Sequence, residues 1–301
     1  PGSGKTTALT NSGLRFPLAD KTGSGSIQGV GGTRNCDWWF TDEAVLIDTA
    51  GRYTTQDSHA ENDKEAWQGF LGLLKKTRPR RPLNGIFLTV SVPDLLGQSQ
   101  QERIRLAEAL RARLLEIDNG LRIRLPIYVL VTKCDLLYGF TEYFDDLGKE
   151  ARGQVWGATL PLTSSSKAQP TQELTTQLQD EIALLARRLN DGLIDRLQQE
   201  SDAVRRSAIF GFPTQFASFA PLLGEFLSEV FVASKFVQSP IVRGVYFTSG
   251  TQEGHPIDRI MSGLARSFGL ARAPTLALAR SGKSYFLLRL LREVVFPEQG
   301  L

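Results

Sequence analysis

The sequence predicts an α/β fold in which a mostly parallel sheet is covered by helices on both faces. Residues 84–92 and 127–132 form continuous apolar runs with the length and composition of buried strands. A helical pattern at about residues 100–116 separates them, and such alternation is typical of a parallel sheet. The third observation is the opening stretch Pro1-Gly2-Ser3-Gly4-Lys5-Thr6-Thr7, a turn of small residues that leads into a helix.

Composition is that of a globular protein with a sizeable core. Of the 301 residues, 41% are apolar and 22% are charged. The net charge of +3 is small and dispersed, so we expect no nucleic-acid partner. The chain has only two cysteines, which excludes a disulfide framework.

The opening turn is predicted to bind phosphate. In a phosphate loop, small residues let backbone N–H groups point at a phosphate, a lysine adds charge, and a hydroxyl coordinates Mg²⁺. We expect the nucleotide to contact Gly2, Ser3, Gly4, Lys5, Thr6 and Thr7, with Thr6 also on the metal. The motif's first glycine would lie two residues before Pro1, so we expect the feeding strand to precede this chain.

A carboxylate that helps to hold Mg²⁺ is predicted after the next strand. Residues 38–40 and 44–47 are apolar runs that indicate a hairpin, and Asp48-Thr49-Ala50-Gly51 follows directly. An Asp at this position can hold Mg²⁺ through water, and Gly51 can donate its N–H to a γ-phosphate. Thr33, between the loop helix and this strand, is the candidate that closes over Mg²⁺ when a γ-phosphate is bound.

A base-reading tetrapeptide is predicted after the strand at 127–132. Thr132-Lys133-Cys134-Asp135 occupies the place of the Asn- or Thr-Lys-x-Asp motif of GTPases. There the Asp accepts hydrogen bonds from the guanine N1–H and amine, while the Lys packs along the ring. The order of these motifs predicts a Ras-like P-loop NTPase domain with Mg²⁺ and GTP or ATP as ligands.

The second half of the chain is predicted to be helical before it returns to a strand. Apolar spacing indicates one long helix at 174–197 and a second at 215–237, whereas residues 242–248 have strand character. We divide the chain into a P-loop domain at 1–160, completed by 241–270, a helical domain at 161–240, and a C-terminal helical segment at 271–301.

A basic, proline-broken connection follows the helix expected at 63–76. The stretch Lys75-Lys76-Thr77-Arg78-Pro79-Arg80-Arg81-Pro82 is most simply a solvated loop. An acidic partner or anionic headgroups are the alternative.

The sequence resembles the IcmF/TssM family of bacterial type VI secretion systems. The resemblance rests on the opening PGSGKTTAL, GVGGTRNCDWWFTDEAVLIDTAGRYTTQD, RPRRPLNG, YVLVTKCDLLYGF, QVWG, RGVYFTSGTQEGHPIDR and KSYFLLRLLREVVFPE. It implies an inner-membrane protein with membrane helices on both sides of this region, which would lie in the cytoplasm. It further implies the partners TssL, TssJ and TssK, and an oligomer in the full complex.

Three functions are compatible with these residues. The first is a nucleotide-dependent switch or scaffold in assembly of the secretion apparatus. The second is a purely structural scaffold with a vestigial P-loop. The third is a free-standing regulatory GTPase, which the missing first strand and the extra helices disfavour.

Slow intrinsic hydrolysis is predicted from the residues after Gly51. Ras-type GTPases place a water-orienting glutamine there, whereas this chain has Arg52, whose guanidinium only donates hydrogen bonds. Arg52 can stabilise transition-state charge, and Gln56 is the nearest glutamine. We expect single-turnover hydrolysis at ~10⁻⁴ s⁻¹ or below in a chain extended through the feeding strand. A rate of ~1 s⁻¹ would contradict this expectation.

Overall fold

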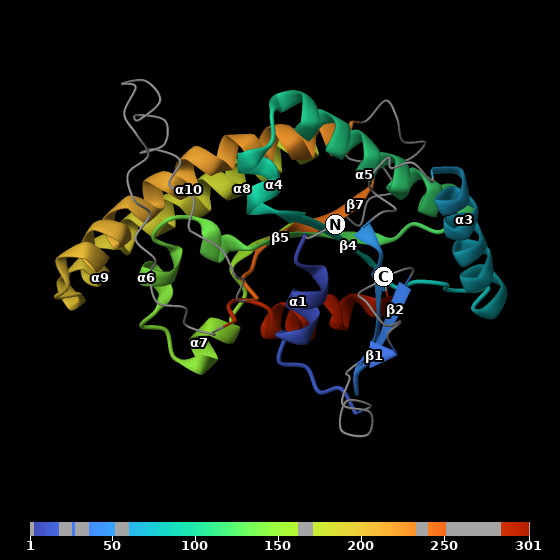
Figure 1. Ribbon diagram of the computed structural model, residues 1–301, viewed down its shortest axis with the longest axis horizontal. Coiled ribbons are helices and arrows are strands. Elements are labelled where there is room, and N and C mark those ends of the chain that lie inside the picture. The colour runs from blue at the N-terminus through green and yellow to red at the C-terminus, as the bar shows by residue number, and fades with distance from the viewer. Residues whose placement is uncertain are drawn as a thin grey trace.

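The computed structural model describes residues 3–17, 26–27, 36–51, 60–161, 171–232, 240–250 and 284–300, which form a mixed α/β arrangement (Figure 1). Its three-stranded sheet is antiparallel, in the order β1-β2-β3. Its four-stranded sheet has the order β4-β5-β7-β6, in which only β6 runs antiparallel. The strands are β1 (Ser26–Ile27), β2 (Cys36–Phe40), β3 (Val45–Thr49), β4 (Ile86–Ser91), β5 (Pro126–Thr132), β6 (Gly157–Thr159) and β7 (Ile241–Phe247).

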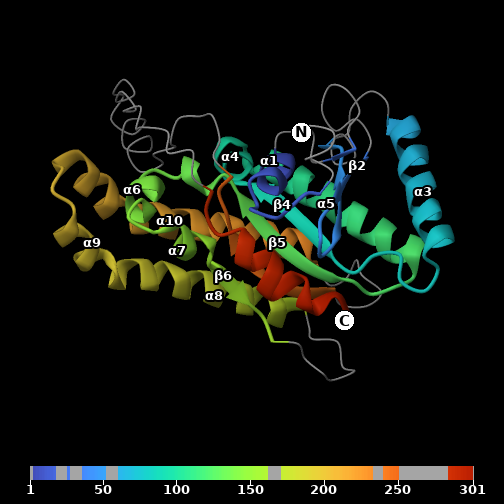
Figure 2. The same ribbon diagram turned by 90° about the horizontal axis from the view of Figure 1, so that it is seen from below.

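Helices cover both faces of the larger sheet. Figures 1 and 2 show α5, α8 and α10 on one face and the C-terminal segment on the other. The helices are α1 (Lys5–Thr10), α3 (Ala60–Thr77), α4 (Val92–Gly97), α5 (Gln100–Leu121), α6 (Phe140–Phe144), α7 (Lys149–Gly153), α8 (Thr171–Asp191), α9 (Leu193–Gln199) and α10 (Ala203–Val230). Shorter turns are η2 (Cys134–Leu136), the π-helical η4 (Leu290–Val295) and η5 (Pro297–Gly300).

Strand β5 is the centre of the larger sheet, and all of its residues are buried. It pairs in parallel with β4 on one side and with β7 on the other. Its odd-numbered residues belong to the apolar cluster that also contains side chains of α5, α8 and α10. Tyr128 and Leu130 point to the opposite face, where they pack with Tyr246 and Leu290. The unbroken apolar run therefore reflects burial on both faces.

The strands and the hairpin expected from the sequence are present, but both long helices differ from the prediction. The helix expected at 174–197 is two helices, α8 and α9, which are interrupted at Gly192. The helix expected at 215–237 begins earlier and ends earlier, because α10 spans Ala203–Val230. Asp202 caps its start through hydrogen bonds from the backbone of Val204 and Arg205.

Two prolines lie within α10, and Pro213 lies just before the start of the helix predicted at 215–237. Pro213 and Pro221 lie inside the helix, where each removes one backbone hydrogen bond. The helix continues through them because its apolar side chains, including Phe212 and Phe216, are fully buried in the main cluster. Tertiary packing outweighs the local cost of the prolines.

The helical segment packs directly on the sheet. Side chains of α8 and α10 share one apolar cluster with β4, β5 and β7. The division into P-loop, helical and C-terminal domains stays a prediction. Residues 251–270 of the segment expected to complete the first domain lie outside the described residues.

Gly244 allows β6 to approach β7 closely. Its φ angle is 156°, and a Cβ atom built on it would lie 2.1 Å from the carbonyl oxygen of Ala158. Any side chain would therefore push β6 off the edge of the sheet.

A buried ion pair holds the C-terminal segment against the sheet. Glu298 of η5 accepts hydrogen bonds from Arg243 of β7, with Nε···Oε2 at 2.8 Å and Nη2···Oε1 at 2.5 Å. The hydroxyl of Tyr128 donates to the same carboxylate at 2.7 Å. The Arg243 and Glu298 side chains are only 6% and 17% exposed, so water screens this bidentate pair weakly.

The surroundings of Glu298 shift its pKa. Burial alone would raise the pKa, but the hydrogen bonds from Arg243 and Tyr128 outweigh burial and hold it below the ordinary value of a glutamate. Because the pKa is lower in the folded than in the unfolded chain, ionised Glu298 stabilises the fold at neutral pH. This contribution is lost as the pH falls through the pKa of the folded state.

Replacing Glu298 with alanine is expected to lower the free energy of unfolding by about 3 kcal/mol at neutral pH, because Arg243 would remain buried without its carboxylate. Urea unfolding at several pH values measures this loss. The difference from the unchanged chain should shrink as the pH falls through the pKa of Glu298.

Glu293→Ala is the matched control in the same segment. Glu293 pairs with Arg289, and these side chains are 53% and 39% exposed, so we expect a loss of about 0.5 kcal/mol or less. Equal losses for the two variants would show that Glu298 has no special role in holding the segment.

Candidate functional site

The carboxyl ends of three parallel strands meet at one edge of the larger sheet. Strands β4, β5 and β7 end there at Ser91, Thr132 and Phe247. Helix α1 is held at this edge by Asn11, whose side-chain amide donates to the carbonyl oxygen of Gly250 at 2.7 Å. In open α/β sheets, ligands bind outside the carboxyl ends of the strands.

The opening turn is joined to the Thr132-Lys133-Cys134-Asp135 tetrapeptide. The hydroxyl of Thr132 donates to the carbonyl oxygen of Ser3 at 2.6 Å. Gly4 has a φ angle of 75°, and a Cβ atom built on it would lie 3.5 Å from the Cε atom of Lys133. The Lys133 side chain therefore runs alongside the turn, and two motifs far apart in the sequence form one surface.

Two of the three residues predicted for the metal side, Thr6 and Asp48, lie together, whereas Thr33 lies outside the described residues. The hydroxyl of Thr6 donates to Oδ2 of Asp48 at 2.5 Å, which places the start of α1 against the end of β3. Asp48 is 2% exposed. A hydroxyl and a carboxylate at this separation can share one cation, as in the Mg²⁺ sites of P-loop proteins.

Lys5 lies among carboxylates in a partly buried position. Burial lowers the pKa of Lys5, and the negative charges of Asp48 and Asp94 oppose that shift. Its ammonium donates to the hydroxyl of Ser3 at 3.3 Å. A poorly solvated cation beside a glycine turn provides a counter-charge for an anionic ligand.

Asp135 is held by the loop that follows β7. The hydroxyl of Ser249 donates to Oδ1 of Asp135 at 2.6 Å. The backbone N–H of Cys134 donates to the carbonyl oxygen of Thr248 at 3.1 Å, which fixes the two loops together. Strand β7 thus brings the small residues 248–250 beside the predicted base-reading aspartate.

The same loop is bonded to the C-terminal segment. The N–H of Tyr285 donates to the carbonyl oxygen of Ser249 at 2.8 Å, and the N–H of Ser249 donates back at 3.2 Å. Ser249 therefore contacts both Asp135 and the start of the segment that Glu298 holds at its other end.

Sequence reasoning missed Asp94. Asp94 lies in the first turn of α4, immediately after β4, and the side chain of Ser91 caps that helix. The available signal was an acidic residue three positions after a buried strand.

Some predicted site residues cannot be placed. Gly2, Thr33, Arg52 and Gln56 lie outside the described residues. Gly51 lies two residues after the end of β3, and Thr7 packs against Gly250, where a Cβ atom built on the glycine would lie 3.2 Å from the Thr7 carbonyl oxygen.

Comparison with known proteins identifies the family. A family model described as the IcmF-related N-terminal domain matches residues 60–301. The chain belongs to the IcmF-related family. It is 55% identical over all 301 residues to the type VI secretion system component TssM1 of Pseudomonas aeruginosa strain PAO1. The match covers 100% of this chain and 27% of that protein. No solved structure matches the chain.

These matches confirm the family resemblance that the sequence motifs indicated. Within the described part of this IcmF-related chain, no helix is both long and apolar enough to cross a bilayer. The same residues contain no cluster of three or more His, Cys, Asp or Glu side chains that could hold a metal ion by themselves.

The IcmF-related chain also has a cavity of about 440 Å³ away from the sheet edge. It lies between α6, residues 155–157, α8 and α9, and its lining includes Tyr143, Trp156 and Arg196. Its volume is in the range of small-molecule pockets, which is roughly 300–1,000 Å³. However, Lys5, Thr6 and Asp135 do not line it. We therefore assign the candidate site by the chemistry of its side chains rather than by the size of the hollow.

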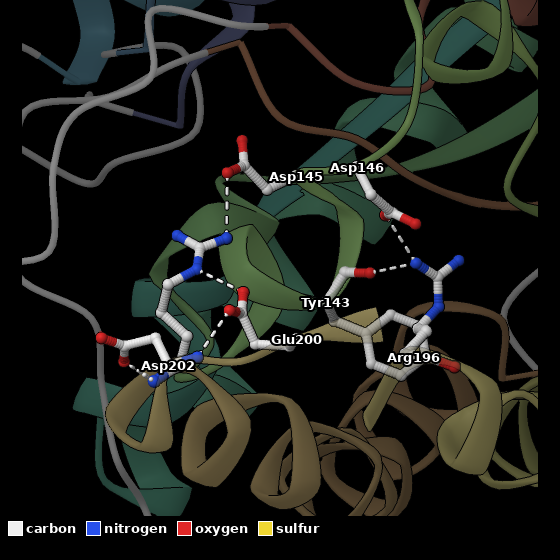
Figure 3. A network of polar contacts seen from close by, with 7 residues as sticks. Tyr143, Asp145, Asp146, Arg196, Glu200 and Asp202 are labelled. Atoms are coloured by element: carbon white, nitrogen blue, oxygen red, sulfur yellow. Dashed lines mark hydrogen bonds and ion pairs between the residues drawn. The ribbon is translucent and has the colours of Figure 1, made fainter. Parts of the chain in front are cut away.

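Figure 3 shows a polar network beside this cavity that ties α6 to α9 and α10. The guanidinium of Arg196 lies 4.4 Å from the Tyr143 ring centre and donates to Asp146 at 2.7 Å. Arg205 donates to Glu200 at 2.7 Å and to Asp145 at 3.0 Å. These contacts fix the helical layer of the IcmF-related chain close to the tetrapeptide, since α6 begins five residues after Asp135.

Proposed function

We propose that this chain is the nucleotide-binding region of a type VI secretion system component and that it binds GTP with Mg²⁺. One observation carries the proposal. The glycine turn and the tetrapeptide are joined by the Thr132–Ser3 hydrogen bond and by Lys133 alongside Gly4. Thus candidate phosphate-binding and base-reading groups occupy one sheet edge.

Each group has a role that its chemistry supports. Lys5 would face the β- and γ-phosphates, and backbone N–H groups of residues 2–7 would surround them. Asp135 would accept hydrogen bonds from guanine, oriented by the hydroxyl of Ser249. Adenine presents the reverse donor pattern at N1, so an ionised Asp135 favours GTP over ATP.

The residues on the metal side fit Mg²⁺. This ion usually takes one or two protein ligands and completes its shell with water and phosphate oxygens. Thr6 would be a direct ligand, and Asp48, which accepts a hydrogen bond from Thr6 at 2.5 Å, would hold the ion through water. When bound, the ion would neutralise charge on the phosphates.

The role in secretion rests on the family. The relative is a type VI secretion system component, and this chain spans about a quarter of its length. We infer that the chain is part of the membrane complex of such a system, on the cytoplasmic side of the inner membrane. In this proposal TssL, TssJ and TssK are partners of the complex, which is an oligomer, and nucleotide acts as a switch during assembly.

Replacing Lys5 with alanine should weaken GTP binding about ten- to a hundredfold, because a charge-assisted hydrogen bond contributes about 1.5–3 kcal/mol. Isothermal titration of a chain extended at its N-terminus measures the affinity. Lys64→Ala, which removes an exposed lysine of α3, is the control and should leave binding unchanged. Unchanged binding in the Lys5 variant would favour the structural scaffold with a vestigial P-loop.

Replacing Asp135 with asparagine should reduce the preference for GTP over ATP about tenfold, because the amide cannot accept both guanine hydrogen bonds. The new amide would keep an oxygen for the Ser249 hydroxyl, so the fold should be retained. Competition titration measures the preference, with Asp42→Asn as an exposed control. Tighter binding of ATP than GTP by the unchanged chain would contradict the assignment of Asp135.

A further inference from the structure

Six exposed cations gather where α3 and α5 end. Lys75 and Lys76 lie in the last turn of α3, and Arg78 and Arg80 follow it. Arg122 caps the end of α5, and Arg124 lies two residues further on. We call this set the basic end surface; it consists of Lys75, Lys76, Arg78, Arg80, Arg122 and Arg124, all of them exposed.

The two stretches are neighbours in space. Helices α3 and α5 share an apolar cluster that contains Trp67, Leu71, Ile117 and Leu121. The ammonium of Lys75 donates to the carbonyl oxygen of Gly120 at 3.0 Å, so the ends of the two helices lie side by side. Figures 1 and 2 both show α3 beside this end of α5, at one extremity of the molecule.

Acidic residues are absent from both stretches of the sequence that form this surface. No Asp or Glu occurs at 66–93 or at 119–134. The nearest acidic residues in the sequence are Asp118 and Glu116, and Glu116 is already paired with Arg113. The whole chain carries a net charge of only +3, so six cations on one surface are a marked local excess.

Arg81 does not belong to the surface. Its guanidinium donates to the carbonyl oxygens of Gln299 at 2.6 Å and Gly300 at 3.0 Å, within the fold. Such internal bonding accounts for one arginine of the basic stretch, whereas Lys76, Arg78 and Arg80 extend into solvent.

An exposed leucine lies one helical turn before Lys76. The side chain of Leu73 on α3 is 55% exposed. Residues three apart on a helix are neighbours, so Leu73 lies next to Lys76. An exposed apolar side chain beside basic residues is a combination by which peripheral surfaces bind the interface of an anionic bilayer.

We propose that the basic end surface binds a bilayer of anionic phospholipids, with Leu73 entering the headgroup region. Flexible cations attract such a surface without needing a fixed arrangement of phosphates. Single-stranded nucleic acid would call for exposed aromatic rings, and the large exposed apolar side chain here is Leu73. The proposal does not depend on nucleotide binding, because the surface shares no residue with the candidate site.

Cosedimentation of the chain with vesicles tests the proposal. The chain should bind vesicles of phosphatidylcholine and phosphatidylglycerol in equal parts, and should not bind vesicles of phosphatidylcholine alone. The triple variant Lys76→Gln, Arg78→Gln, Arg80→Gln should bind about a hundredfold more weakly, because each cation contributes about fivefold near an anionic surface. Arg105→Gln, Lys149→Gln, Arg187→Gln is the matched control, with the same change in net charge at exposed sites elsewhere.

A second pair of variants tests the apolar contribution. Leu73→Ser should weaken vesicle binding about tenfold, in line with the transfer of a leucine side chain out of water. Ile194→Ser, which changes an exposed isoleucine on α9, should have no effect. All variants change exposed side chains, so circular dichroism should show the fold of the unchanged chain.

Any of three outcomes would overturn the assignment of the surface to lipid. Failure of the unchanged chain to bind anionic vesicles removes the proposal outright. Equal loss in the two triple variants would show that net charge alone attracts the chain. Binding to soluble polyglutamate as tight as to vesicles, with no effect of Leu73→Ser, would assign the surface to an acidic protein instead.

Discussion

Burial of β5 on both faces is the constraint on which the rest of the structure depends. A strand with no solvent-facing side needs neighbours on both edges and a helical layer above and below. Strands β4 and β7 supply the edges, α5, α8 and α10 supply one layer, and the C-terminal segment supplies the other. Because β4 and β7 run parallel to β5, their carboxyl ends meet at one edge. The position of the candidate site follows from that alignment.

Local patterns predicted the central elements well. The continuous apolar run of β5 and the β2–β3 hairpin are short-range signals, and both were recognised. The start of α10 was not, because Pro213 favours a helix break in isolation and tertiary packing overrides it. The break between α8 and α9 at Gly192 was not predicted, because the apolar spacing continues across it. The Arg243–Glu298 pair joins residues 55 apart and has no signature in either local sequence.

The residues of the candidate site also fall into those that the sequence predicted and those that only the structure revealed. Lys5, Thr6, Asp48 and Asp135 could be chosen in advance because each belongs to a motif with fixed spacing after a strand or turn. The contacts Thr6–Asp48 and Thr132–Ser3 agree with those choices. Ser249 was not chosen as a site residue, and its bond to Asp135 depends on how β7 enters the sheet. Motif reasoning therefore finds the groups that would touch a ligand more readily than the groups that orient them.

The hydrogen bonds between Ser249 and Tyr285 have a mechanical consequence. Residues 284–300 are fastened at one end to the loop that contacts Asp135 and at the other end to β5 and β7 through Glu298. Because both ends of the segment are held by hydrogen bonds, the segment is restrained from sliding along the sheet. The segment thus forms a short, stiff linkage between Asp135 and the far side of the sheet.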